Sequence, residues 1–167
     1  MKKYFLTITL VLLTFVCCRG DEEDIQTIDQ VLNLYIHNSA GQDMLNSKID
    51  GSYTSINLVD LLDETALKPI TGYSLIKDAD TVTYLDYPAG AVRLLQDSIS
   101  PEEKIYYSNF IIQLVTTKNS VTTTDPDTIR IEYKWTPSLF QLSKLWYNDE
   151  LKFTKVQGQR NVVKIVK

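Results

Sequence analysis

Apolar and polar residues alternate with a period of two through much of this chain, which is the pattern of half-buried β-strands. In residues 128–135, four large apolar side chains alternate with four polar ones, three of which are charged. A shift of one residue in the register of this strand would bury those three charges. The sequence therefore predicts a strand here whose register is firmly set.

Similar but shorter patterns predict further strands in both halves of the chain. They cover residues 30–38, 52–62, 67–70, 72–77, 92–95, 106–116, 145–153 and 161–167. Residues 52–62 are also compatible with the start of a helix, because three leucines there have helical spacing, but Pro69 would end such a helix early. The strand interpretation is favoured. Residues 145–153 are expected to form a hairpin that turns at Asn148 and Asp149, two residues that tolerate positive φ.

Clusters of turn-forming residues separate these segments. Turns are expected at residues 38–43, 63–64, 78–80, 118–120 and 124–127, and a loop at 84–90. Residues 100–103, Ser-Pro-Glu-Glu, are typical of a helix start, but strand-like sequence follows at once, so a single helical turn is expected. Seven to nine short strands, regular turns and no long helix together predict an all-β fold, an antiparallel β-sandwich.

The first eighteen residues differ from the rest of the chain and predict where the protein is sent. Lys2 and Lys3 precede residues 4–16, a run of thirteen residues without a charge. This length fits the apolar segment of a secretory signal peptide and falls short of the roughly 20 apolar residues needed to span a bilayer. Cys17 and Cys18 then end the segment, and the sequence turns polar.

Phe15-Val16-Cys17-Cys18 resembles a bacterial lipobox, in which a small residue precedes a cysteine that receives a diacylglyceryl thioether. Cys18 is the expected lipidation site, because Cys17 is a smaller preceding residue than Val16. Cys17 is the alternative site, since Phe15 replaces the usual leucine. The resemblance implies stable attachment to a membrane, because each buried methylene of the acyl chains contributes about 0.8 kcal/mol. An ordinary signal peptide that ends in two incidental thiols is the other interpretation.

An acidic run, Asp21, Glu22, Glu23 and Asp24, follows the cysteines directly. Such a run serves as a solvated tether. It also resembles the acidic export signal that Bacteroidota place after the lipidated cysteine of cell-surface lipoproteins, which implies an outer-membrane protein that faces the outside of the cell. The expected organisation is a signal peptide at residues 1–17, a lipidated cysteine and flexible tether at 18–29, and one β domain at 30–167.

Charge and cysteine content narrow the function classes. Lys2 and Lys3 leave with the signal peptide, so the 17 basic side chains become 15, against 21 acidic ones, and the mature net charge is −6. This balance argues against nucleic acid as a partner. Both cysteines lie at the end of the signal peptide, so neither a disulfide framework nor a four-cysteine metal site is expected in the domain.

Several motifs of the domain resemble those of a broad group of small, mostly uncharacterised Bacteroidota lipoproteins. They are the Asn-Ser-Ala-Gly-Gln-Asp-Met-Leu turn at 38–45, the Asp-Thr-Ile strand at 127–129, the Trp-Tyr-Asn-Asp hairpin at 146–149 and the final strand at 163–167. Two residues depart from the group's pattern, since Met44 stands for a leucine and Asp149 for a hairpin glycine. The resemblance implies an Ig-like β-sandwich on the outer membrane, and it brings no catalytic residue with it.

Catalytic chemistry has little support in the sequence. His37 is the only histidine, so a multi-histidine metal site is excluded. Acids occur close together at Asp60 with Asp63 and Glu64, Asp78 with Asp80, Asp125 with Asp127, and Asp149 with Glu150. A glycosidase needs two facing carboxyl groups, but turn chemistry explains each pair more simply. The spacing at 78–80 and 125–127 would also suit a calcium loop, although neither has the twelve-residue loop with its terminal Glu. No metal or cofactor is therefore expected.

Aromatic residues give the strongest candidate for a binding site. Tyr84 and Tyr87 lie in the expected loop together with Asp86. Exposed aromatic rings beside polar groups suit stacking on sugar rings or contact with a protein partner. The alternative is that these are ordinary strand tyrosines. Trp135 and Trp146 are expected to fill the core of the sandwich.

Two functional hypotheses follow. The first is a non-catalytic lipoprotein of the cell surface whose sandwich binds an envelope protein or a glycan, or has a structural role. The second is a glycan-active hydrolase that uses one of the acid pairs. The first hypothesis is favoured, because it accounts for the signal peptide, the acidic tether and the strand pattern. The second depends on the number of acids alone.

Overall fold

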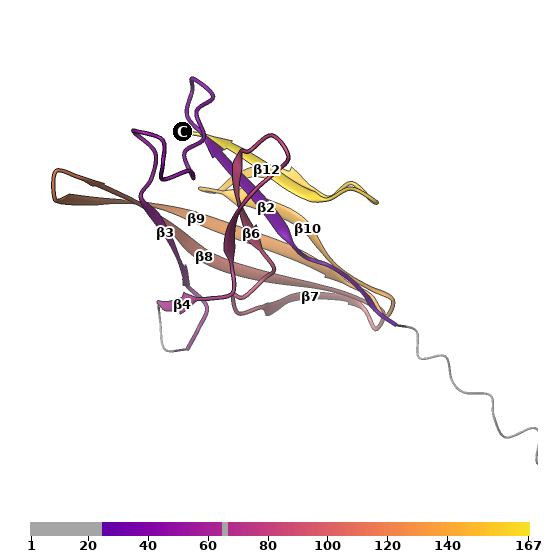
Figure 1. The fold of residues 1–167 in the computed structure, drawn as a ribbon. Helices are drawn as coiled ribbons and strands as arrows, with labels where there is room; N and C mark the ends of the chain where they lie inside the picture. Colours follow the sequence, from indigo (N-terminus) through magenta and orange to yellow (C-terminus); the bar gives the residue numbers. More distant parts are fainter. Residues whose placement is uncertain (1–24, 65–66) are drawn as a thin grey trace, which may run out of the picture.

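The structure is a computed structural model, which describes residues 25–64 and 67–167. These residues form twelve β-strands joined by turns, with no helix among them (Figure 1). The strands are β1 (Thr27–Asp29), β2 (Leu32–His37), β3 (Ser55–Asp60), β4 (Lys68–Ile70), β5 (Ser74–Lys77), β6 (Thr83–Tyr87), β7 (Leu94–Ser100), β8 (Glu103–Lys118), β9 (Val121–Trp135), β10 (Leu139–Tyr147), β11 (Glu150–Thr154) and β12 (Asn161–Val166). The expected signal peptide, both cysteines and the acidic run at 21–24 lie outside the described residues.

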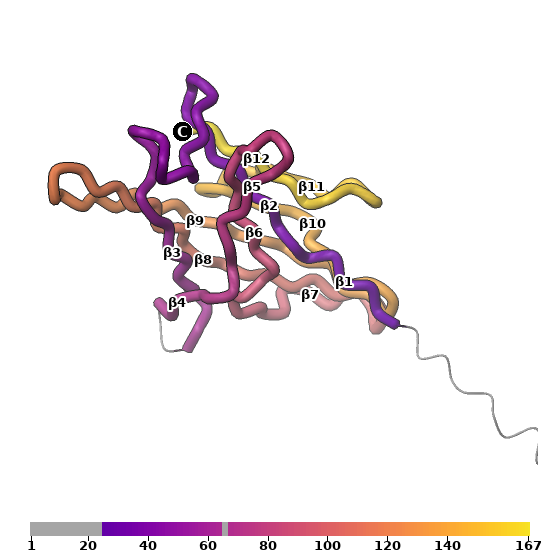
Figure 2. The backbone as a smooth tube through the Cα atoms, in the orientation of Figure 1, coloured from indigo at the N-terminus to yellow at the C-terminus, as the bar shows by residue number. Residues whose placement is uncertain are grey.

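The long hairpin of β8 and β9 is the centre of the larger, eight-stranded sheet. On its other edge β8 pairs with two strands, with β3 along residues 110–115 and with β7 along residues 103–107. β10 pairs with β9, and β11 and β1 pair with different parts of β10. β4 completes the sheet beside β3. The tip of the β8–β9 hairpin projects from one end of the molecule (Figure 2).

The smaller sheet has four strands in the order β12-β2-β6-β5. β2, β6 and β5 pair in antiparallel fashion, whereas β12 runs parallel to β2. A second parallel pair joins β1 to β10 in the large sheet. The predicted all-β sandwich is thus confirmed, but it has more strands than the seven to nine expected, and two of its pairings are parallel.

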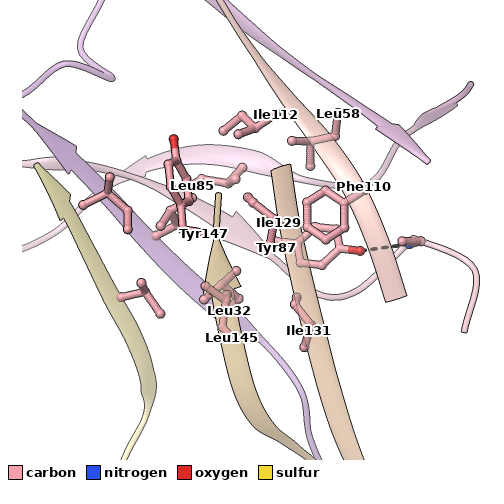
Figure 3. Close-up of a cluster of buried hydrophobic side chains, with 14 of the residues drawn as sticks. Leu32, Leu58, Leu85, Tyr87, Phe110, Ile112, Ile129, Ile131, Leu145 and Tyr147 are labelled. Atoms are coloured by element: carbon pink, nitrogen blue, oxygen red, sulfur yellow. Dashed lines mark hydrogen bonds between the residues drawn. The ribbon is translucent and has the colours of Figure 1, made fainter. Parts of the chain in front are cut away.

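The two sheets enclose one apolar core (Figure 3). Alternate residues of β2, β6 and β12 enter it from the small sheet, and alternate residues of β8, β9 and β10 enter it from the large one. The rings of Phe110 and Tyr87 lie 5.0 Å apart in this core. The Tyr87 hydroxyl accepts a hydrogen bond of 2.9 Å from the Ala91 N–H, so this buried polar group is satisfied.

The register predicted for residues 128–135 is confirmed, because Ile129, Ile131 and Tyr133 are fully buried. The two tryptophans differ from the prediction. Trp135 is half-buried and packs against the edge of the core. Trp146 pairs in register with Arg130 and shares its outward face, so the expectation that it fills the core is wrong.

Two segments expected to be a turn and a loop are strands. Residues 124–127 continue β9, where Pro126 pairs with Gln113 of β8. Proline is tolerated there because β10 pairs with β9 only from Ile129 onward, which leaves Pro126 on an open edge. Residues 83–87 form β6, since Thr83, Leu85 and Tyr87 all point into the core.

The helical turn expected at residues 100–103 is a tight turn between β7 and β8. Ser100 still caps it, because its hydroxyl accepts a hydrogen bond of 3.2 Å from the Glu102 N–H. The residues after the turn pair at once with β7, and this pairing replaces the hydrogen bonds that a helix would have formed.

The folded part begins before the expected end of the tether. β1 covers Thr27–Asp29 and pairs with β10. The Asp29 carboxylate forms an ion pair of 2.6 Å with Lys155 and accepts a hydrogen bond of 3.0 Å from Asn161. A strand of three residues is too short for its alternation to stand out from an acidic tether in the sequence.

Candidate functional site

The outer face of the small sheet carries the best candidate for a binding site. β6 places Tyr84 and Asp86 on this face, because Thr83, Leu85 and Tyr87 point into the core. The sequence groups Tyr84, Asp86 and Tyr87 in one binding loop. The structure keeps the first two together but buries Tyr87, which is 1% exposed. Tyr87 is therefore a core residue and the prediction for it is wrong.

Tyr84, Tyr35 and His37 form a row of rings on this outer face, which we call the aromatic row. The Tyr84 and Tyr35 ring centroids are 5.2 Å apart with 29° between the ring planes. The Tyr35 and His37 rings are 6.3 Å apart and nearly parallel, at 5°. These separations lie in the range of favourable aromatic pairs. All three side chains are half-buried, so each ring is supported by the sheet and keeps part of its surface in solvent.

Strand pairing produces the aromatic row. Tyr35 and His37 are two residues apart on β2 and so share a face. The pairing of Leu34 with Leu85 brings Tyr84 of β6 beside Tyr35. In the sequence, Tyr35 and His37 stand on the polar side of the alternation in residues 30–38. No pattern in the chain pairs that segment with residues 83–87, so the row could not be assembled from sequence alone.

Charged groups lie next to the aromatic row. The Tyr35 hydroxyl donates a hydrogen bond of 3.2 Å to Asp78 Oδ2, and the Lys164 ammonium lies 5.8 Å from the centroid of the Tyr35 ring. Burial, and after it the hydrogen bond to the Asp78 carboxylate, raises the pKa of Tyr35. The hydroxyl therefore stays protonated at physiological pH and holds its ring in one orientation.

A short chain of hydrogen bonds runs across the same face. Arg160 Nη2 donates to Asn33 Oδ1 at 2.8 Å, and Asn33 Nδ2 donates to Asp86 Oδ1 at 2.8 Å. Asn33 is only 3% exposed, whereas Arg160 is exposed and Asp86 is half-buried. The buried amide thus fixes a guanidinium and a carboxylate, two groups that can exchange hydrogen bonds with hydroxyl groups of a ligand.

Apolar side chains on the edge strands extend this surface. Ile76 of β5 pairs with Tyr84 and is 40% exposed. Val162 and Val166 of β12 are 37% and 68% exposed. The outer face therefore combines stacked rings, aliphatic edges and a few polar groups held in place, features that suit contact with a ligand.

The acids that the sequence offers as catalytic pairs have structural partners. Asp60 accepts hydrogen bonds from the N–H groups of Leu62 and Val92, at 2.8 and 2.5 Å. Asp78 accepts hydrogen bonds of 3.0 and 2.9 Å from the backbone of its own turn, and Glu150 forms an ion pair of 2.7 Å with Lys152. The backbone contacts of Asp60 and Asp78 favour the turn interpretation, and Glu150 is engaged within β11. In residues 25–64 and 67–167, no three His, Cys, Asp or Glu side chains gather as a metal site would require.

The remaining acid pair, Asp125 and Asp127, belongs to a polar cluster where the end of β12 meets the large sheet. Asp127 is 4% exposed and accepts hydrogen bonds of 2.6 Å from the Tyr147 hydroxyl and from Asn148 Nδ2. The Lys167 ammonium forms ion pairs with both Asp127 and Asp125. Burial alone would raise the pKa of Asp127, but these three donors outweigh it and lower the pKa. The cluster stabilises the join between the sheets.

Side-chain hydrogen bonds hold the turn that follows β2. Asn38 Oδ1 accepts hydrogen bonds from the N–H groups of Ala40 and Gln42, and Gly41 has a φ of 81°. Asp43 is 8% exposed, and its carboxylate accepts a hydrogen bond of 2.8 Å from the Thr83 N–H, which ties this turn to β6.

The predicted hairpin at 145–153 is confirmed, with φ values of 48° at Asn148 and 64° at Asp149. These values are those of a two-residue turn with positive φ at both positions, a conformation that asparagine and aspartate tolerate. Asn148 Oδ1 also accepts a hydrogen bond of 2.8 Å from the Thr128 N–H.

The part of the chain that the structure describes contains no helix long and apolar enough to cross a membrane. Comparisons of the chain with protein-family models, with curated proteins and with solved structures find no match.

Proposed function

We propose that this protein is a non-catalytic binding lipoprotein of the outer membrane, displayed on the cell surface, which binds a glycan through the aromatic row. The main observation in support of this proposal is the stack of Tyr84, Tyr35 and His37 on an exposed sheet face, with polar groups fixed at its side. Aromatic rings stack on the apolar faces of sugar rings, while neighbouring polar groups bond to their hydroxyls. An envelope protein is the alternative partner.

The proposed location depends on the leader. The uncharged run at 4–16, the lipidation site at Cys18 or Cys17 and the acidic residues Asp21, Glu22, Glu23 and Asp24 together support a lipid-anchored, exported domain. Attachment at one end leaves the sandwich free to turn its outer faces to the surroundings.

External protease is expected to remove the domain from intact cells that express the native precursor, because a surface-displayed domain is accessible. A blot for the domain, beside a blot for a periplasmic control protein, measures this. Replacing the four acids at 21–24 by serine is expected to protect the domain while lipidation persists. If the unaltered domain is protected as well as the periplasmic control, the surface location is wrong.

The substitution Tyr35→Ala is expected to weaken glycan binding at least tenfold, because Tyr35 is the central ring of the aromatic row and its loss separates the other two. The measurement starts with a glycan array on the unaltered domain and continues by calorimetry with the strongest glycan found. Tyr106→Ala is the matched control, since Tyr106 is a half-buried tyrosine of β8 in the other sheet.

The glycan proposal fails if the unaltered domain retains no glycan on the array, or if Tyr35→Ala and Tyr106→Ala weaken binding equally. Thermal unfolding of both variants shows whether each remains folded. Capture of an envelope protein that depends on Tyr35, without glycan binding, would point to the alternative partner instead.

The hydrolase hypothesis gains no support from the hollow beside β4, which has a volume of about 260 Å³ and includes two acids, Asp60 and Asp63. Asp60 accepts two backbone hydrogen bonds, and Asp63 forms an ion pair of 3.2 Å with Lys68. Carboxylates engaged in this way are poorly placed to exchange protons with a glycosidic oxygen.

A further inference from the structure

A second group of aromatic and basic side chains lies on the outer face of the large sheet. Arg130 of β9 places its guanidinium carbon 4.6 Å from the ring centroid of Tyr107 on β8 and 5.8 Å from that of Trp146 on β10. The three side chains thus span three neighbouring strands. We call this group the arginine stripe. It belongs to the other sheet and shares no residue with the aromatic row.

The strand pairing fixes the arginine stripe. Trp146 pairs directly with Arg130, and Arg130 pairs with Asn109, two residues along β8 from Tyr107. Gln96 of β7 holds the guanidinium from the side, because its Oε1 accepts a hydrogen bond of 2.7 Å from Arg130 Nη2. An arginine stacked on rings and held at one edge has few rotamers left, so it loses little entropy when it binds a ligand.

Among the described residues, Arg130 lacks the ion pairs that the lysines of this face form. Lys134 pairs with Glu103 at 2.8 Å, and Lys144 pairs with Glu132 at 3.2 Å. Within residues 25–64 and 67–167, Arg130 forms no ion pair. The only hydrogen bond that its guanidinium forms among these residues goes to a neutral amide, so most of the guanidinium N–H donors remain available to an anion.

We propose that the arginine stripe is a binding site for a carboxylate-bearing saccharide such as a uronic acid. The guanidinium would bind the carboxylate through two parallel hydrogen bonds, the geometry that Arg matches best. Trp146 and Tyr107 are half-buried rings on either side and would contact the apolar faces of the sugar. Charge complementarity selects the acidic sugar, since the one unpaired cation of the stripe lies at its centre.

This site is independent of the aromatic row, because the two lie on different sheets and share no residue. The domain would then have two binding faces, one on each sheet. Loss of one site would leave the other intact, so the two proposals can fail separately.

The test uses trigalacturonate as the probe and its methyl ester as the uncharged control, with titration calorimetry on the full mature domain. The unaltered domain is expected to bind trigalacturonate at least tenfold more tightly than the ester. Arg130→Gln is expected to abolish this difference, and Arg130→Lys to retain only part of it, because lysine keeps the charge without the paired donors. Tyr106→Ala, which alters neither the aromatic row nor the arginine stripe, is expected to leave the affinity for trigalacturonate unchanged.

Lys134→Gln is the matched control, because it removes one positive charge from the same face of the same strand. The proposal is overturned if Lys134→Gln weakens binding as much as Arg130→Gln, which would indicate non-specific attraction. Equal affinity for the acid and the ester, or no binding of either at millimolar concentration, overturns it too. Tighter binding of a triglutamate peptide than of trigalacturonate would show that the ligand is an acidic peptide and not a saccharide. Thermal unfolding verifies that each variant is folded.

Discussion

Replacing Phe110 by alanine is expected to lower the free energy of unfolding by about 4 kcal/mol. Phe110 is fully buried at the middle of β8, and its ring packs 5.0 Å from that of Tyr87 on the opposite sheet. The substitution removes the buried ring, leaves a cavity between the two sheets and breaks this aromatic pair. Denaturant unfolding measures the change, and the midpoint of thermal unfolding should fall by roughly 8–16 °C for a domain of this size.

Val121→Ala is the control for this prediction. Val121 lies on the projecting end of the β8–β9 hairpin and is 64% exposed, so its truncation should change stability by less than about 0.5 kcal/mol. A loss below about 1 kcal/mol for Phe110→Ala would mean that the sheets close the cavity, contrary to the packing described. The slope of the denaturant curve should stay constant if both variants unfold in one step.

The period-two alternation predicted most of the strands and the inward face of the clearest ones. Residues 30–38 and 128–135 are buried on the expected side because one face of each strand had to leave water. Turn-forming residues predicted the turn correctly where the backbone needs positive φ, as at Asn148 and Asp149. These features depend on neighbouring residues in the sequence, so a local sequence pattern is sufficient to predict them.

Features that depend on a neighbouring strand could not be predicted in this way. Pro126 reads as a turn residue, and its place in β9 follows only from the open edge beside it. Residues 83–87 read as an aromatic loop, yet β2 and β5 pair with them on both sides. The parallel pairing of β1 with β10 joins segments more than 100 residues apart, and neither segment carries a signal for the other.

In the candidate site, too, local features could be predicted from the sequence, whereas features that depend on strand pairing could not. Tyr84 and Asp86 were predicted as binding residues because tyrosine beside polar groups is informative by itself. Tyr87 was wrongly included, because a loop would expose it and a strand buries it. Tyr35 was missed, since its importance comes from its contact with Tyr84 across two strands. The arginine stripe was missed for the same reason, as its three members lie on three strands.

Replacing Asp127 by asparagine is expected to lower the free energy of unfolding by about 2 kcal/mol at pH 7. The carboxylate is buried, and it forms an ion pair with Lys167 and accepts hydrogen bonds from Tyr147 and Asn148. Asparagine keeps the shape but removes the charge, so the Lys167 ammonium, which is 22% exposed, loses its buried partner. Denaturant unfolding at constant salt measures the loss.

Asp125→Asn is the matched control, since Asp125 lies on the same strand and contacts the same lysine, but its side chain is 52% exposed. An exposed ion pair contributes little, so this substitution should cost less than about 1 kcal/mol. Equal losses for the two variants would show that burial does not strengthen the contacts of Asp127 relative to those of Asp125.

The pH dependence of this difference tests the charge itself. The pKa of Asp127 is lower in the folded protein than its ordinary value, so its stabilisation is complete above the unfolded pKa of about 3.9 and is lost as the pH falls through the folded pKa. The pKa of Lys167 is raised, despite burial that favours the neutral amine, so its stabilisation is present below about pH 10 and is lost as the pH rises through the folded pKa. The stability difference between the unaltered protein and Asp127→Asn should therefore be constant from about pH 5 to pH 9 and shrink on both sides. A difference that persists unchanged at pH 2–3 would mean that shape rather than charge holds the cluster together.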